Sequence, residues 1–433
     1  MYSNRKSSIV IYVILAIMVV DTIFNQHEEI SVYLKTYGSD IILFVLLAAL
    51  AIAGQLYILE FVKYKSRGIR NKVRHIRVSY KLTNALQYLV IADFTFLIFG
   101  MHILNQYPTL SLAFVTAATY GLNIALMVVF TKIFLSWYKS SRNSIVVLLY
   151  GLSFAVVVIT SSIFLTGNML RFAEKPAFIS DLEQYLSKAE PGSLLYLLNK
   201  IYHYSDIASF ALKWIPTAFL LYHYSQKMGR TKYWILISLP LIYFLGTHLD
   251  DFDTYKPHGE SEEFYWNLYV TYNSTAGGIL FYIGFVVATK HFHNNWAIKD
   301  YLIISGFGFL LFFSAGQTTL AFSPYPPFGF ATMSFYGLST YLILLGLYAS
   351  AISVSEDIEL RKSIKKSTLR EAKFLYSMGT ARMENELMKR MVVKAEEELR
   401  ERAQESGIEA SLGEEDIINI VRESEKDVKK KTT

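Results

Sequence analysis

The sequence predicts an all-α, polytopic integral membrane bundle of about ten transmembrane helices, followed by a C-terminal cytoplasmic helical tail. Hydrophobic residues make up 53% of the 433 residues and charged residues only 18%, whereas soluble domains carry about 25% charged residues. The apolar residues occur in long runs separated by polar loops. The end of the chain differs, because 18 of the 36 acidic residues follow residue 355. We therefore expect a membrane bundle over 1–355 and a charged helical tail over 356–433.

Ten apolar runs are long enough to cross a bilayer as helices, which takes roughly 20 residues for a hydrocarbon core of about 30 Å. The first and seventh runs are the shortest. The expected spans are 8–24, 40–62, 82–104, 110–136, 144–166, 204–225, 232–248, 268–290, 301–322 and 333–355.

The charge of the loops predicts how these spans are oriented. The loop between the second and third spans carries eight Lys and Arg residues and no acid, whereas 248–267 carries six acids and one lysine. Basic loops alternate with acidic or neutral ones, although the basic excess of 290–300 is small. Since basic loops stay in the cytoplasm, we expect a multi-pass protein of the cell membrane with both termini cytoplasmic.

One long outside segment, 167–203, divides the spans five and five. We expect short surface helices within it, over 178–187 and 194–202. An odd number of spans in each half would make any internal repeat inverted, which is the topology of one class of transporter. The two halves share no residue-level similarity, so the repeat is a geometric possibility only.

Four polar residues of the expected spans are candidates for a site in the membrane, and Asp206 is the nearest of them to the outside. Asp93 of the third span and Lys213 of the sixth have similar depths, so an ion pair between them is possible. Asp206 precedes Lys213 by seven residues and shares its helix face, and Asn123 lies in the fourth span. Because charges inside a bilayer are costly, they mark candidate proton, ion or ligand sites. The alternative is a structural pair that fixes the register of the helices.

A cluster of histidine and carboxylate side chains lies in the loop after the seventh span. Imidazole with carboxylate suits Zn²⁺, Mn²⁺ or Cu²⁺, and carboxylates alone suit Ca²⁺. The spacing matches no known metal loop, so a solvated acidic loop or a pH-sensing site are the alternatives. The weak candidate ligands are His248, Asp250, Asp251, Asp253 and His258.

The sequence gives no sign of catalysis. Cysteine is absent, which excludes disulfides and thiolate metal sites. The phosphate-binding, dinucleotide-binding, zinc-protease and serine-hydrolase motifs are also absent. We therefore expect a protein that is not an enzyme and holds no cofactor. Of the 42 Lys and Arg residues, 25 lie among the apolar spans, and the 17 in the tail are balanced by its acids, so the expected partner is the lipid bilayer and not nucleic acid.

The charged tail has the pattern of a coiled coil. Met378, Asn385, Val392 and Leu399 follow one another at seven-residue spacing, and Asn385 at an a position is typical of parallel dimers. A rival stripe runs through Met383, Leu387 and Met391, as in an ordinary amphipathic helix. The segment 414–428 predicts a further short helix, which we expect to dock on a cytoplasmic protein partner or fold back on the tail.

Two segments at the end of the chain carry a resemblance to a known group of proteins. The run 350–357 joins the last span directly to a charged stalk, and 377–384 follows within that stalk. Over about the last quarter of the chain this resembles uncharacterised multi-span membrane proteins of archaea, those of the ammonia-oxidising lineages. The resemblance implies a source and a membrane location, and no activity.

The architecture supports two hypotheses for function. In the first, the protein is a receptor-like or scaffold membrane protein, with the bundle as sensing input and the tail as a homodimerising or partner-docking output in signal transduction. In the second, it is a secondary transporter or channel that uses Asp93 and Lys213. The first requires a tail that pairs or docks, and the second requires functional charges inside the membrane.

Overall fold

The protein folds as a helical bundle, seen here in a computed structural model. The structure describes residues 4–26, 39–140, 145–180, 192–222, 229–247, 269, 277–286, 289, 296–316, 318–323, 325–356 and 370–406. Its elements are α1 (Asn4–Gln26), α3 (Asp40–Lys65), α4 (Arg67–Lys72), α5 (Arg74–Leu104), β1 (Gln106–Pro108), α6 (Thr109–Ser140), α7 (Ile145–Glu174), β2 (Phe178–Ser180), α8 (Leu194–Leu221), α10 (Arg230–Thr247), α12 (Trp296–Ala315), the 3₁₀ turn η2 (Leu320–Phe322), α13 (Phe330–Met333), α14 (Tyr336–Glu356) and α16 (Arg370–Ser406).

Six helical segments among the described residues are both long and apolar enough to cross a membrane, which makes this a membrane protein of the all-α class. Helices α3, α5, α6 and α7 are four of them. The six segments are Asp40–Lys65, Arg74–Leu104, Thr109–Lys139, Ile145–Glu174, Ile298–Phe322 and Phe330–Glu356.

The expected count of ten spans is larger than the six segments found among the described residues. In that part of the chain the apolar stretch of α1 is Val10–Asn25, and the helix Gly277–Val286 is bordered by residues that the structure does not describe. Helix α8 has 28 residues but carries Lys200, Asp206 and Lys213, and α10 has 18 residues and begins with Arg230. Each of these four segments coincides with an expected span, and none of them qualifies by the length and composition of its described residues alone.

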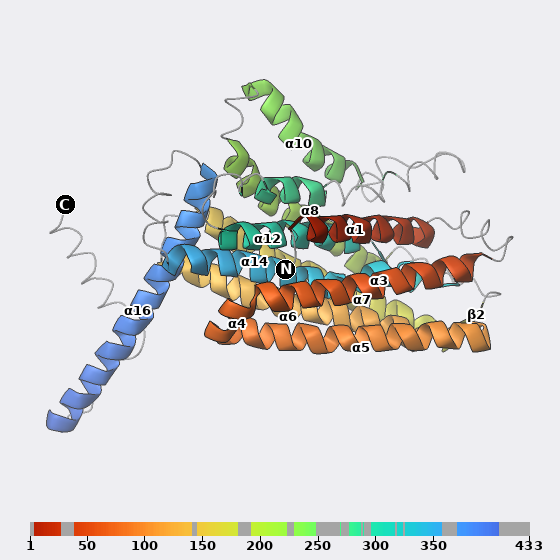
Figure 1. Cartoon of the computed structure of the whole chain (residues 1–433), viewed down its shortest axis with the longest axis horizontal. Coiled ribbons are helices and arrows are strands. Elements are labelled where there is room, and N and C mark those ends of the chain that lie inside the picture. Colours follow the sequence, from red (N-terminus) through yellow and green to blue (C-terminus); the bar gives the residue numbers. More distant parts are fainter. Residues whose placement is uncertain are drawn as a thin grey trace.

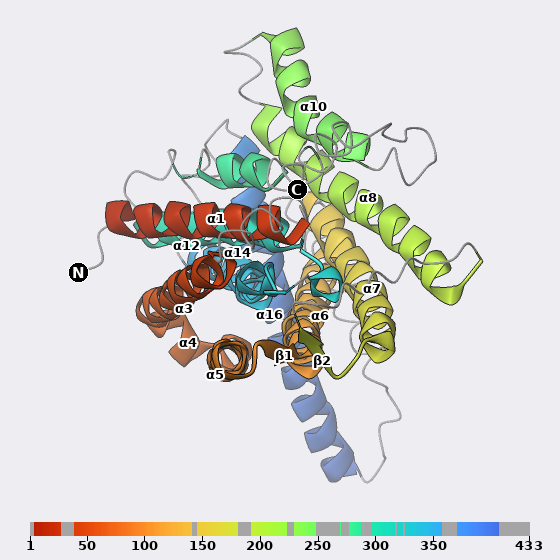
Figure 2. The same cartoon turned by 90° about the vertical axis from the view of Figure 1, so that its right-hand side faces the viewer.

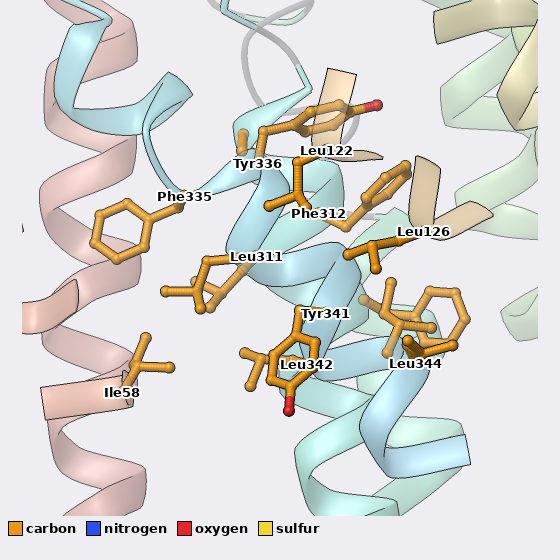
Figure 3. Close-up of a cluster of buried hydrophobic side chains, with 14 of the residues drawn as sticks. Ile58, Leu122, Leu126, Leu311, Phe312, Phe335, Tyr336, Tyr341, Leu342 and Leu344 are labelled. Atoms are coloured by element: carbon orange, nitrogen blue, oxygen red, sulfur yellow. The ribbon is translucent and has the colours of Figure 1, made fainter. Parts of the chain in front are cut away.

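Helix α14 lies at the centre of the bundle and is buried on all sides (Figures 1 and 2). Its sequence is apolar around the whole circumference, as a fully buried helix requires. It packs along α12 and also contacts α6 and α5. Figure 3 shows Ile58 of α3, Leu126 of α6 and Leu311 of α12 among the side chains around it. Any displacement of α14 must therefore disturb several neighbours at once.

Helices α1 and α8 cross the bundle obliquely. In Figure 2, α3 and α5 are seen end-on whereas α1 and α8 are seen lengthwise. Helix α8 packs against α7, and α10 packs against α8 on the outer side. Helix α8 therefore brings its polar residues to the bundle from one flank.

A two-stranded antiparallel sheet of β1 and β2 joins the loops after α5 and α7, with Tyr107 opposite Ile179. The expectation of a helix beginning at 178 was wrong for residues 178–180, and residues 181–191 lie outside the described part. The expected short helix 194–202 is the first part of the long α8. Helix α7 also continues to Glu174, so the segment between the two halves is shorter than 167–203.

An irregular segment connects α12 to α14, and a buried carboxylate of α1 holds it in place. Asp21 is fully buried and accepts hydrogen bonds from the backbone N–H groups of Gly329 (2.9 Å) and Thr332 (2.7 Å), and from the Thr332 hydroxyl (2.8 Å). Gly329 has φ 91°, and a Cβ there would lie 2.4 Å from Thr318 Cγ2. This position therefore requires glycine, and the carboxylate satisfies free donors at the start of α13.

Candidate functional site

A cavity inside the bundle gathers charged, hydroxyl and aromatic side chains from α6, α7, α8, α10, α12 and α14. The cavity has a volume of about 40 Å³, enough for a few water molecules or a small ion. It is lined by Tyr120, Val157, Thr160, Ser161, Tyr202, Asp206, Ser209, Lys213, Phe244, Phe312, Phe313, Gly316 and Tyr336.

Lys213 is the buried cation of this cavity, with only 3% of its surface exposed. Its Nζ donates a hydrogen bond to Ser209 Oγ at 2.9 Å. The same Nζ lies 5.6 Å from the ring centroid of Phe312 and 4.9 Å from that of Phe313, within the range of cation–π attraction. Asp206, which precedes it by seven residues on α8, lines the same cavity.

The facing wall is a hydrogen-bond network around Asn123. Its Nδ2 donates to Ser161 Oγ at 2.7 Å and lies 3.5 Å from Tyr336 Oη, and its Oδ1 accepts from the Thr340 hydroxyl at 2.7 Å. The rings of Tyr120 and Tyr336 pack 4.4 Å apart beside it. Asn123 therefore ties α6 to α7 and α14 at the depth of the cavity, one layer behind the lining.

Asp93 is not part of this site. It is half-buried on α5 and accepts a hydrogen bond from Ser111 Oγ at 3.1 Å. Both Asp93 and Lys213 lie in the described part of the chain, and they form no ion pair, contrary to the possibility that their matched depths suggested. Equal depth in the membrane does not fix the direction in which a side chain points from its helix. Helices α5 and α8 lie on different sides of the bundle (Figure 2).

The histidine and carboxylate loop cannot be placed, because His248, Asp250, Asp251, Asp253 and His258 all lie outside the described residues. Within the described residues, no group of three or more His, Cys, Asp or Glu side chains is positioned to hold a metal ion. The expected helix 414–428 also lies outside the described part.

The tail helix α16 packs onto one end of the bundle, against α14, α6, α8 and α7. Met378 is fully buried, and Asn385 donates from Nδ2 to Ser136 Oγ of α6 at 2.7 Å. Val392 is also largely buried, and Leu399 is partly exposed. Met378 and Asn385, the first two residues of the predicted dimer seam, thus make contacts within the chain.

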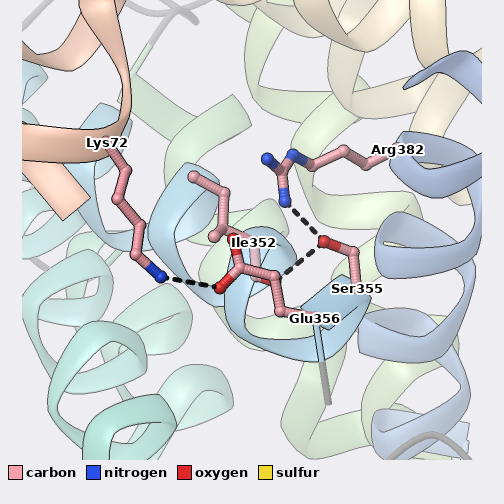
Figure 4. Close-up of polar contacts among 5 residues, drawn as sticks. All are labelled: Lys72, Ile352, Ser355, Glu356 and Arg382. Atoms are coloured by element: carbon pink, nitrogen blue, oxygen red, sulfur yellow. Dashed lines mark hydrogen bonds and ion pairs between the residues drawn. The ribbon is translucent and has the colours of Figure 1, made fainter. Parts of the chain in front are cut away.

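Polar contacts made by the end of α14 complete this joint, as Figure 4 shows. Arg382 of α16 donates to Ser355 Oγ and lies 5.9 Å from the Tyr348 ring centroid. Glu356 pairs with Lys72 of α4, with 3.2 Å between Nζ and Oε2. The stripe on the other side of α16 is exposed, with 48% of Leu387 and 41% of Met391 open to the surroundings.

Two buried polar groups of the bundle escaped the sequence analysis. Asp21 supports the segment before α14, and Gln87 donates from Nε2 to Gln55 Oε1 at 2.7 Å and to the backbone oxygen of Ser334 at 3.1 Å. The available signals were an acidic residue at the end of the first apolar run and a glutamine, Gln87, inside the third span, since such groups need partners in a bilayer. Both clusters fix the start of α14.

Comparison with known proteins gives no relative: no family model, curated protein or solved structure matches the chain. The fold and the site therefore carry the functional argument alone.

Proposed function

We propose that this chain is a receptor-like membrane protein, in which the bundle senses a ligand and the tail helix α16 passes the signal on. The supporting observation is that α14 contributes both to the cavity and to the surface on which α16 docks. Its first residue, Tyr336, lines the cavity, and its last three turns carry Tyr348, Ser355 and Glu356, to which α16 and α4 bind. One buried helix thus connects the candidate input site to the candidate output.

The coupling follows from close packing. A ligand that displaces Tyr336 must also move the Asn123 network, because their side chains lie within 3.5 Å of each other. Packed interiors accommodate such a change by shifting between discrete arrangements of whole helices. A shift of α14 then alters the Arg382–Ser355 contact and with it the docking of α16. The ligand acts by binding one arrangement more tightly than the other.

We propose ten spans, with both termini in the cytoplasm of a cell-membrane protein. The four additional helices are α1, α8, α10 and Gly277–Val286. Six and ten are both even, so either count leaves the start of the chain and the end of α14 on one side. The basic helix α4 lies at the α16 end of the bundle (Figure 1), which favours the cytoplasm for that end.

The output surface that we propose is the exposed stripe of Leu387 and Met391 on α16. While α16 is docked, a second copy of the chain or a cytoplasmic partner protein can bind this stripe, whereas Met378 and Asn385 face the bundle. Release of α16 would free the seam of Met378, Asn385, Val392 and Leu399 for a coiled-coil dimer. The segment 414–428 remains a proposed docking helix, and membership of the archaeal group remains a proposal from resemblance.

A secondary transporter or channel is the second candidate, because Lys213 and Asp206 line a cavity at the depth of the spans. Here Lys213 acts with Asp206, since Asp93 lies elsewhere. Neither proposal involves catalysis or a cofactor.

One pair of measurements separates the two functions. A Ser136→Cys/Asn385→Cys protein in lipid nanodiscs, joined by a short bis-maleimide, reports the docking of α16. In a receptor, Lys213→Gln changes the rate of this crosslinking several-fold, whereas Lys200→Gln does not. In a transporter, Lys213→Gln leaves crosslinking unchanged and abolishes ion flux into proteoliposomes. Unchanged crosslinking would refute the receptor proposal.

A further inference from the structure

We infer that the cavity between α8, α12 and α14 binds a small monovalent anion of halide size, held by the ammonium group of Lys213. This inference deepens the proposed receptor function on which it rests, because it names the class of ligand at the input site. The observations that carry it are the burial of the cation, the donors around it and the size of the space.

The first observation is a buried cation without a partner of opposite charge in contact. No described carboxylate lies within 4.0 Å of Lys213 Nζ, and its one hydrogen bond goes to the neutral Ser209. An ammonium group has three donors, and its burial costs several kcal/mol unless an opposite charge compensates for it. The rings of Phe312 and Phe313 supply only part of that compensation. A bound anion would supply the rest.

The second observation is that the surrounding donors suit an anion. Ser209 Oγ accepts from Lys213 and keeps its own O–H to donate. The hydroxyl groups of Ser161, Tyr120 and Tyr336 line the same space and hydrogen-bond to one another. A small anion beside Lys213 would therefore meet one charge-assisted hydrogen bond and the O–H donor of Ser209.

Asp206 limits the charge that the cavity accepts. It lies seven residues before Lys213 on the same helix, about 10 Å along the axis, and lines the cavity together with Tyr120, Tyr202 and Tyr336. Its carboxylate attracts Lys213 without making an ion pair with it. Its carboxylate repels a second negative charge, so the site favours a monovalent anion over sulfate or phosphate.

The third observation is size. A cavity of about 40 Å³ accommodates a chloride, bromide or nitrate ion with a few waters. It leaves no room for an organic ligand of drug size, whose pockets are typically about 300 Å³ or more.

The test is a titration of the purified full-length protein in nanodiscs with sodium bromide, at ionic strength held constant with sodium gluconate. The thermal unfolding midpoint is followed by tryptophan fluorescence. For wild type we expect a saturable rise of a few degrees with bromide, since a ligand of the native state stabilises it. Lys213→Gln should abolish this response, and Ser209→Ala should weaken bromide affinity several-fold. The control Lys200→Gln should respond to bromide as the wild type does.

The outcomes separate this inference from the function on which it rests. No bromide-dependent rise in wild type, or an equal rise in Lys213→Gln, overturns the anion site. Should Lys213→Gln fail to fold, the Ser209→Ala titration decides, because an unchanged affinity there overturns the site as well. Bromide binding without a change in Ser136/Asn385 crosslinking supports the anion site and refutes the receptor coupling. Crosslinking that changes in Lys213→Gln but does not respond to bromide would support the receptor coupling and overturn the anion site.

Discussion

Asn385 of the tail helix donates a hydrogen bond to Ser136 Oγ of α6 at 2.7 Å, although 249 positions separate the two residues in the chain. The same asparagine sits at the a position that the heptad pattern assigns to a parallel dimer. The contact shows that this face of α16 packs against the end of its own bundle.

This contact predicts an intramolecular crosslink. Cysteines at Ser136 and Asn385, joined by a short bis-maleimide in intact membranes, should give a product that runs as a monomer on denaturing gels. Asn385→Cys alone should give little dimer, because the position faces α6. Leu387→Cys alone should give more, since that side chain is exposed. Strong dimer from Asn385→Cys with none from Leu387→Cys would contradict the docked arrangement.

The close approach of α16 to α14 depends on Gly379. A Cβ at this position would lie 2.6 Å from Val354 Cγ1 and 2.9 Å from Val354 Cβ, and Val354 is fully buried. We expect Gly379→Ala to weaken docking by about 1–3 kcal/mol through overpacking, seen as a lower yield of the Ser136/Asn385 crosslink.

Gly68→Ala is the matched control for this substitution. Nothing lies within 4 Å of a Cβ placed there, so the variant measures the intrinsic helix gain of alanine over glycine, about 1 kcal/mol. Val354→Ala should restore part of the crosslinking in the Gly379→Ala background. Equal yields from Gly379→Ala and wild type would show that α16 is not held at this distance.

The sequence predicted the spanning helices where composition alone decides, as in α3, whose apolar run leaves no alternative. It also placed Asp206 and Lys213 on one face, because a spacing of seven residues is a property of a single helix. It failed where two helices must be oriented relative to each other. The suggested pairing of Asp93 with Lys213 and the free dimer seam at Asn385 both required knowledge of which neighbour each face meets.

Neutralising the Asp21 side chain should cause a large loss of stability. Its two oxygens accept three hydrogen bonds from Gly329 and Thr332, and an asparagine would place an NH₂ group against one of those donors. We expect Asp21→Asn to lower the free energy of unfolding by about 2–4 kcal/mol, as for a broken buried charge-assisted network. The measurement is thermal unfolding in detergent, with the exposed Glu60→Gln as control. Matching midpoints for the two variants would exclude this role.

Lys175, outside the spans and just after α7, provides a test by pH. Burial lowers the pKa of its ammonium group to about 8, because the charged form is poorly solvated there. About half of the side chain is therefore uncharged at pH 8, against well under 1% for an ordinary lysine. A water-soluble N-hydroxysuccinimide ester should acylate Lys175 at pH 8 many times faster than the exposed Lys232, as measured by mass spectrometry of peptides.

The same shift gives the sign of a stability change. Between pH 8 and about 10.5 the unfolded chain binds more protons at this position than the folded one, so the stability of the fold rises with pH over that window. Lys175→Gln should remove this contribution and make the wild-type and variant curves diverge above pH 8. Acylation of Lys175 at the rate of Lys232, together with parallel stability curves, would show that the side chain is solvated and that the loop after α7 does not enclose it.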